Sequence, residues 1–123
     1  MADHVRDSAA RTAVVAQIED EEALSNMEAI ASTTGIDCLF VGRMDLTISM
    51  GAYSPLDARV VEAVELICQT GRRHGKAVGM FIPQGEDCAI WQQKGASLFL
   101  LGSDQQFLLD GARLLCTKIT PME

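Results

Sequence analysis

The stretch CLFVG, residues 38–42, is a short and unbroken apolar run that ends in glycine. Such a run predicts a β-strand that other elements cover on both faces, as in a parallel sheet. Helix-forming segments lie on either side of it, at residues 21–33 before Gly35 and at residues 46–50 before Gly51. The run therefore favours an α/β fold with parallel strands.

The same alternation of strand and helix occurs four times along the chain. Strands are predicted at residues 12–18, 38–42, 77–82 and 97–101. Helices are predicted at residues 21–33, 46–50, 54–74, 86–94 and 105–115. Ser54 is the expected N-cap of the longest helix, because Pro55 follows it and Asp57 stands at the third helical position. Four such units fit either a doubly wound sheet or half of an eight-unit barrel, which takes about 250 residues.

The alternation defines one domain over residues 12–116. Residues 1–11 are polar and are predicted to be a flexible N-terminal segment, and residues 117–123 a loose C-terminal tail. The polar start is typical of neither a signal peptide nor a membrane span.

Charge and cysteine usage narrow the class of protein. The chain has 10 Lys and Arg residues against 17 Asp and Glu residues, a net charge of −7 that argues against a nucleic-acid partner. Its four cysteines, at positions 38, 68, 88 and 116, form no Cys-x-x-Cys pair, which favours reduced core thiols of a cytoplasmic protein over a zinc site. Neither Gly-x-Gly-x-x-Gly nor a Walker A sequence occurs, so nucleotide binding has no support.

Polar residues follow three of the predicted strands, at the edge where parallel α/β folds place their chemistry. Glu19 and Asp45 would end neighbouring strands, whose axes lie about 4.8 Å apart. Two carboxylates so close repel each other unless a cation lies between them, and oxygen ligands suit Mg²⁺ or Mn²⁺. Gln17 would share a strand face with Glu19 and could hold a substrate oxygen.

A simpler interpretation of these carboxylates remains open. Asp45 could cap the helical turn at residue 46, and Glu19 could begin the helix that follows it. Asp104, after the fourth strand, is expected to be a helix N-cap.

Four segments together resemble a known family: VVAQIED (14–20), GIDCLFVGRMDLTISMGA (35–52), GKAVGMF (75–81) and GASLFLLGSD (95–104). They are similar to the second half of the metal-dependent, class II 2-oxo acid aldolases typified by 4-hydroxy-2-oxoheptanedioate and 2-dehydro-3-deoxyglucarate aldolases. The resemblance covers residues 12–115. Its most specific parts are Gln-x-Glu at a strand end and the later Gly-x-x-Asp-Leu.

The resemblance implies a fold and a set of site residues. The fold would be the second half of a TIM (β/α)₈ barrel with parallel strands. Glu19 and Asp45 match the family's metal-binding carboxylates, and Gln17 matches a residue that contacts the 2-oxo acid. The backbone amides of Met44 and Asp45 match those that hold the substrate carboxylate.

The activity that the resemblance implies is a reversible carbon–carbon cleavage. It would give pyruvate, or a related 2-oxo acid such as oxaloacetate, and an aldehyde. The cofactor would be Mg²⁺, Mn²⁺ or Co²⁺, which stabilises an enolate as a Lewis acid. The alternatives are a non-catalytic module that binds metal and 2-oxo acid, and a citrate-lyase-like lyase.

No catalytic residue is assigned, because the family's catalytic His and Arg come from strands that precede the matching region. His4 and His74 are expected to be solvated or to cap a helix. Arg43 stands where the family usually has Pro, and it either brings charge toward the substrate or points outward.

Half a barrel would leave two unpaired sheet edges and an open inner face that includes Val15. A homodimer or higher oligomer is therefore expected, in which two copies cover each other. The alternative is that the other half of the barrel, or the termini, cover the edges. The expected partners are small molecules, with no nucleic acid and no membrane.

Overall fold

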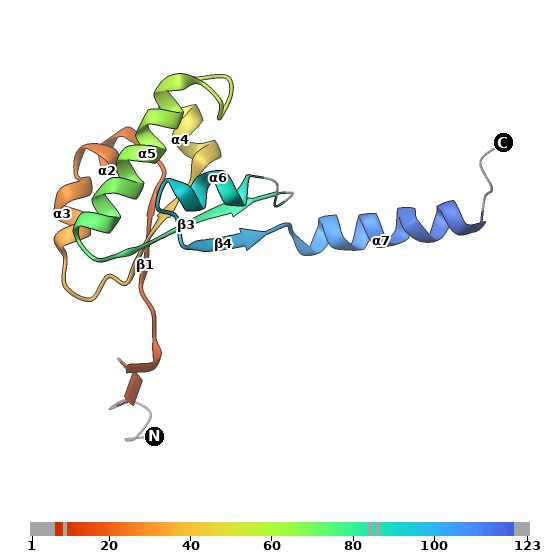
Figure 1. Cartoon of the computed structure of the whole chain (residues 1–123), viewed down its shortest axis with the longest axis horizontal. Coiled ribbons are helices and arrows are strands. Elements are labelled where there is room, and N and C mark those ends of the chain that lie inside the picture. Colours follow the sequence, from red (N-terminus) through yellow and green to blue (C-terminus); the bar gives the residue numbers. More distant parts are fainter. Residues whose placement is uncertain (1–6, 9, 84, 86, 120–123) are drawn as a thin grey trace.

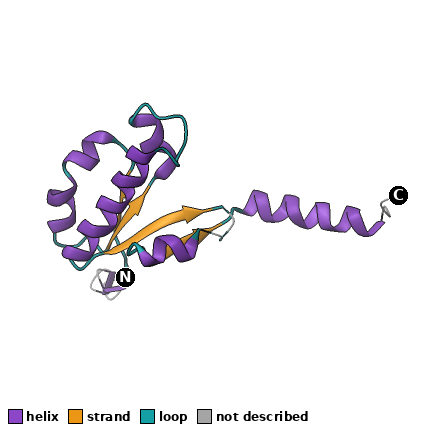
Figure 2. Ribbon diagram, turned by 45° about the horizontal axis from the view of Figure 1, so that its top comes forward, coloured by secondary structure: helices purple, strands orange, loops and turns teal. Residues whose placement is uncertain are grey.

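A computed structural model describes residues 7–8, 10–83, 85 and 87–119. Its strands are β1 (Val15–Ile18), β2 (Cys38–Val41), β3 (Ala77–Ile82) and β4 (Leu98–Leu101). They form one sheet in the order β1-β2-β3-β4, and every neighbouring pair is parallel (Figure 2). The helices are α2 (Glu21–Ser25), α3 (Met27–Ser32), α4 (Arg43–Ser49), α5 (Ala58–Arg73), α6 (Cys88–Gln93) and α7 (Asp104–Ile119). The predicted parallel α/β fold is confirmed.

One face of the sheet carries the hydrophobic core. Alternate strand residues point to this face, and they are almost completely buried: Ile18, Leu39, Val41, Val78, Met80 and Ile82. The helix α5 packs on β2 and β3 and adds Val60, Val64 and Ile67 to the same cluster. Trp91 of α6 joins them, so a single core fixes the strands beneath the helices.

The opposite face of the sheet is open in the described part of the chain. Val15 is 48% exposed and Leu100 53% exposed, and Phe40 between them is half-buried. A Cβ atom at Gly79 would lie 2.8 Å from the Phe40 ring and 3.1 Å from Leu98, so these two side chains close over the glycine. The run CLFVG is itself buried or half-buried at every position, as expected, with Cys38 only 4% exposed on this face. The face is open beside it, at Leu100 and at Val15, where an open inner face was expected.

Two helix starts differ from the sequence prediction. The segment predicted as one helix over 21–33 is two, α2 and α3, because the chain turns at Asn26, whose side-chain amide donates to the Glu22 carbonyl at 3.0 Å. The N-cap of α5 is Asp57, which accepts from the Arg59 amide at 3.0 Å, and not Ser54. Ser54 Oγ instead accepts from the Leu56 amide at 3.1 Å and forms a turn just before the helix.

The ends of the chain also differ from the prediction. The helix α7 continues to Ile119, so the described part of the expected tail, residues 117–119, is helical. Its N-cap is Ser103, whose Oγ accepts from the Gln106 amide at 3.2 Å, and not Asp104. Of the expected flexible segment, residues 7–8 and 10–11 are helical and the rest lies outside the described residues. The division of the chain into an N-terminal segment (1–11), one domain (12–116) and a C-terminal tail (117–123) remains a prediction.

The helix α7 projects away from the rest of the molecule (Figure 1). None of its residues is buried, although it carries several large apolar side chains: Phe107, Leu108, Leu109, Leu114, Leu115 and Ile119. Among the helices that the structure describes, none is both long and apolar enough to cross a membrane.

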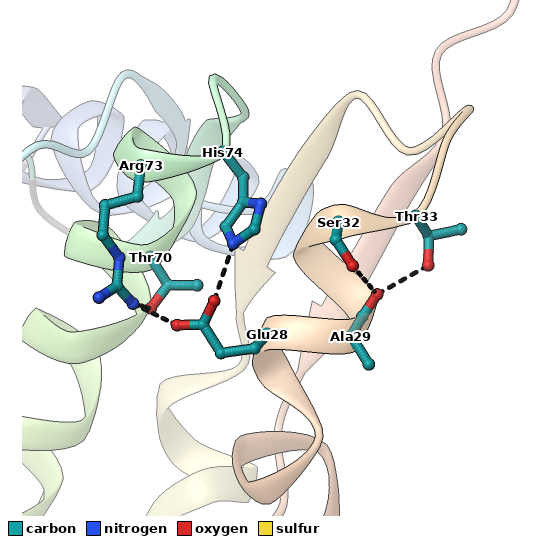
Figure 3. A network of polar contacts seen from close by, with 7 residues as sticks. All are labelled: Glu28, Ala29, Ser32, Thr33, Thr70, Arg73 and His74. Atoms are coloured by element: carbon teal, nitrogen blue, oxygen red, sulfur yellow. Dashed lines mark hydrogen bonds and ion pairs between the residues drawn. The ribbon is translucent and has the colours of Figure 1, made fainter.

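A polar network ties α3 to the end of α5 (Figure 3). His74 Nε2 lies 2.8 Å from a carboxylate oxygen of Glu28, Arg73 donates to the other oxygen, and Arg73 also donates to Thr70 Oγ at 2.9 Å. The hydrogen bond from His74 lowers the pKa of Glu28 below its ordinary value. His74 is also the C-cap residue of α5, so the helix-end role predicted for it is confirmed.

Candidate metal and substrate site

The strand register brings Glu19 beside Gly42. Ile18 pairs with Val41 at the ends of β1 and β2, and the Gly42 amide donates to the Ile18 carbonyl at 3.0 Å. A Cβ atom at Gly42 would lie 2.7 Å from Glu19 Cβ and 3.0 Å from Gln17 Nε2. The φ of Gly42 is −82°, which any residue adopts, so it is the space beside Glu19 that requires a glycine here.

Gln17 orients the Glu19 carboxylate. Its side-chain Nε2 donates to Glu19 Oε2 at 2.6 Å. The interpretation of Glu19 as the start of the following helix is wrong, because Asp20 is the N-cap of α2 and accepts from the Ala23 amide at 2.6 Å. Glu19 is thus available at the strand end for another role.

Asp45 lies in the first turn of α4, which begins at Arg43 and not at the predicted residue 46. The N-cap residue of this helix is Gly42, and it makes no side-chain capping hydrogen bond, so the interpretation of Asp45 as a cap is wrong. Asp45 is exposed, and no hydrogen bond to its carboxylate from another described residue is found. Met44 precedes it and is 59% exposed.

Two hollows meet at Asp45. The first, about 350 Å³, is lined by Glu19, Asp20, Asp45, Ile48 and Ser49. The second, about 310 Å³, is lined by Gln17, Phe40, Val41, Gly42, Arg43, Met44, Asp45, Pro55, Phe81 and Pro83. All four predicted site residues therefore border one hollow or the other, and the two predicted metal ligands border the same one.

The first hollow fits a divalent cation in its donor chemistry. Its lining has three carboxylates and one hydroxyl, and no Lys or Arg. No group of three or more His, Cys, Asp or Glu side chains that could hold a metal occurs within the described residues. Mg²⁺ is commonly bound through one or two carboxylates, with substrate and water as its other ligands. Glu19 and Asp45 fit that mode of binding rather than a closed cage.

Sequence reasoning missed most of the walls of both hollows. Pro55 and Pro83 come from loops that are remote in sequence, and no local pattern places them at the ends of β1 and β2. Phe40 could have been found, because it pairs in register with Gln17 and must share its face.

The Arg43 side chain packs against α6 and does not point into solvent. Its guanidinium lies 5.5 Å from the centre of the Trp91 ring and 4.0 Å from Asp87, and its side chain is 13% exposed. The outward orientation is therefore wrong. Arg43 borders the second hollow.

The cysteines do not take part in either hollow. All four are free thiols, and Cys38 and Cys68 are buried as predicted, whereas Cys88 is half-buried and Cys116 exposed. Burial raises the pKa of the Cys68 thiol to about 11, so this side chain is a neutral core group.

Parallel strand–helix units with carboxylates at the strand ends are the arrangement of α/β-barrel enzymes. Residues 1–110 match the HpcH/HpaI aldolase/citrate lyase family, and the chain belongs to this family. A 5-keto-4-deoxy-D-glucarate aldolase of Shigella boydii serotype 18 is 32% identical over 105 residues, which are 85% of this chain and 41% of that enzyme.

Solved structures agree with this assignment. A HpcH/HpaI aldolase/citrate lyase family protein from Burkholderia cenocepacia J2315 superposes with a TM-score of 0.86 at 30% identity, over 95% of this chain and 46% of that one. A HpcH/HpaI aldolase from Desulfitobacterium hafniense DCB-2 has a TM-score of 0.82 over 99% of this chain and 48% of that one, and at 22% identity shows the fold alone. The predicted TIM-barrel-type units are confirmed, and the chain spans under half the length of these relatives.

Proposed function

We propose that this chain carries the metal and 2-oxo acid part of a carbon–carbon lyase site, in which Glu19 and Asp45 hold a divalent cation. The observation that supports it most is that these two carboxylates, one directly after β1 and the other in the first turn of α4, border one acidic hollow. Mg²⁺, Mn²⁺ and Co²⁺ are the candidate ions. When bound, such an ion would act as a Lewis acid toward the negative charge that develops on the 2-oxo acid as its carbon–carbon bond breaks.

The other predicted residues are proposed to position the substrate. Gln17 holds the Glu19 carboxylate through its amide nitrogen, and its place beside both carboxylates suits contact with the 2-oxo acid. The backbone amides of Met44 and Asp45 lie in the first turn of α4, where helix N–H groups have no partner within the helix. They are proposed to donate to the substrate carboxylate.

The proposed substrate is a 4-hydroxy-2-oxo acid that splits reversibly into an aldehyde and pyruvate or oxaloacetate. The name of the Shigella relative, an aldolase of a keto-deoxy sugar acid, supports this class. The second hollow, which shares Asp45 with the first, is also lined by Phe40, Pro55 and Phe81. These apolar walls would hold the part of the substrate that becomes the aldehyde.

Calorimetric titration of Mn²⁺ and Mg²⁺, with and without oxalate, tests the metal assignment. Glu19→Gln and Asp45→Asn should each weaken binding by about 10-fold or more, because each removes a charged ligand. Glu22→Gln is the matched control, since Glu22 is an exposed carboxylate of α2 that does not border the hollow. Equal affinity in the wild type and both ligand variants would refute the proposal.

A second candidate function is a module that binds metal and 2-oxo acid without rapid turnover. It is favoured by the position of His74, the histidine that the structure describes, which pairs with Glu28 and borders neither hollow. Loss of a general base costs about 10²–10⁴-fold in rate. The purified chain should then cleave 4-hydroxy-2-oxo acids that much more slowly than a longer relative, while metal-dependent decarboxylation of oxaloacetate persists.

Cleavage by the chain at the full rate of its relatives would rule out the second candidate and place the base within these residues. Cleavage of a citryl substrate in the same assay would indicate a citrate-lyase-like reaction instead.

We also propose that the chain associates with a second copy of itself and that it works in the cytoplasm. The open sheet face and the edges of β1 and β4, each paired on one side in the described sheet, support association with a second copy. The four unpaired thiols support a reducing compartment, the cytoplasm.

A further inference from the structure

The second hollow contains one cationic side chain among the residues that line it. Arg43 lines this hollow together with apolar residues, among them Phe40 and Phe81, and with the polar residues Gln17 and Asp45. Asp45 is the other charged residue of this lining, and the proposed function assigns it to the metal ion. With Asp45 so engaged, Arg43 favours an anionic group on a bound ligand, because a charge-assisted hydrogen bond is strong in a mostly apolar hollow.

The guanidinium of Arg43 is held in place but is not neutralised by a close ion pair. Its acidic contact among the described residues is Asp87 at 4.0 Å, and the Asp87 side chain is 47% exposed. The Trp91 ring supports it at 5.5 Å. No hydrogen bond from the guanidinium to another described residue is found, although an arginine carries five N–H donors.

Lys94 contacts the same Trp91 ring as Arg43 but differs from it in its ion pairing. Its ammonium also lies 5.5 Å from the Trp91 ring, but it forms a direct ion pair with Glu65 of α5 and borders neither hollow. Trp91 thus supports two cations of different kinds. Lys94 is paired within the fold, whereas Arg43, which lines the second hollow, has its one acidic contact among the described residues at 4.0 Å.

From this arrangement we propose that Arg43 is a specificity-determining residue that binds a second carboxylate, at the far end of a dicarboxylic substrate. The inference rests on the proposed function, which places the 2-oxo acid end of the substrate at Glu19 and Asp45. The planar guanidinium can meet a carboxylate through two parallel hydrogen bonds, and its burial against Trp91 reduces the entropy lost on binding.

Two matched ligands test this role in calorimetric titrations with the whole chain and saturating Mn²⁺. The ligands are 2-oxoadipate and 2-oxohexanoate, which share a six-carbon chain and a 2-oxo acid end and differ in the distal carboxylate. Wild type should bind 2-oxoadipate more tightly by about 10-fold or more, the scale of a charge-assisted hydrogen bond. Arg43→Gln should abolish that preference and leave the affinity for 2-oxohexanoate within about twofold.

Arg43→Lys should restore part of the preference, and Lys94→Gln, the control at the same ring, should leave it intact. A merely structural Arg43 would lower the affinity for both ligands equally, or for neither, and either result overturns the inference alone. If the wild type binds neither ligand in the presence of Mn²⁺, the proposed function fails and this inference fails with it.

Discussion

At the scale of single residues, the candidate metal site depends on Gly42, which has no side chain and so leaves room for that of Glu19. Gly42 lets the Glu19 side chain pass directly over the end of β2, with Gln17 fixing its carboxylate. The sequence predicts that Glu19 and Asp45 belong to the site, because each of them follows the apolar run of a strand. It does not predict the packing of Glu19 on Gly42, because that contact depends on the register of two strands.

Gly42→Ala should disturb the candidate metal site while leaving the fold intact. The new methyl group would lie 2.7 Å from Glu19 Cβ, an atom close to the backbone, so the whole Glu19 side chain must shift. We expect a loss of Mn²⁺ affinity of about 10-fold, as for other residues that orient metal ligands. Gly111→Ala, where a Cβ meets nothing within 4 Å, is the control for the substitution itself. Unchanged Mn²⁺ affinity in Gly42→Ala would mean that Glu19 does not need this position.

At the scale of elements, strands were predicted better than helix ends. The strand β3 has the predicted bounds of 77–82, because its apolar run stops at Pro83 and begins after Gly75 and Lys76. The start of α4 was missed because its N-cap, Gly42, gives no side-chain signal. The orientation of the Arg43 side chain could not be predicted from its sequence neighbours. Its partners Asp87 and Trp91 lie far along the chain, at the start of α6 and within it.

The network of Glu28 should make the packing of α3 on α5 depend on pH. The pKa of Glu28 is lowered from 4.5 in the folded chain, so the stabilisation is fully present above that value and is lost as pH falls through the lower folded pKa. The difference in unfolding free energy between wild type and Glu28→Gln should therefore shrink as the pH is lowered from about 6 to about 3.

Urea denaturation at several pH values measures this difference. Glu22→Gln, a neighbouring exposed carboxylate of α2 with no ion pair to another described residue, should show a smaller dependence. A difference for Glu28→Gln that stays constant, or grows as the pH falls, would contradict the role given to His74 and Arg73.

At the scale of the whole molecule, the described chain has one covered and one open sheet face. Apolar side chains on the open face and along α7 are exposed, which is costly for an isolated monomer. The chain covers 41% of the length of its Shigella relative. We expect these 123 residues, purified alone, to self-associate through the open face.

Light scattering at micromolar concentration should give a mass of at least twice 13.3 kDa. Leu100→Glu, on the open face, should shift the population toward monomer, and Leu66→Glu, exposed on α5, should not. A compact monomer that melts cooperatively, with Leu100→Glu having no effect on mass, would refute self-association.

Glu19 and Asp45 are expected to bind one divalent cation together. Anomalous diffraction from crystals grown with Mn²⁺ and oxalate tests it most directly, because the peak locates the ion without reference to activity. We expect a single strong peak in the first hollow, within about 2.5 Å of one carboxylate oxygen from each residue. A peak elsewhere, or a fully occupied peak that touches neither carboxylate, would contradict joint binding of the ion by Glu19 and Asp45.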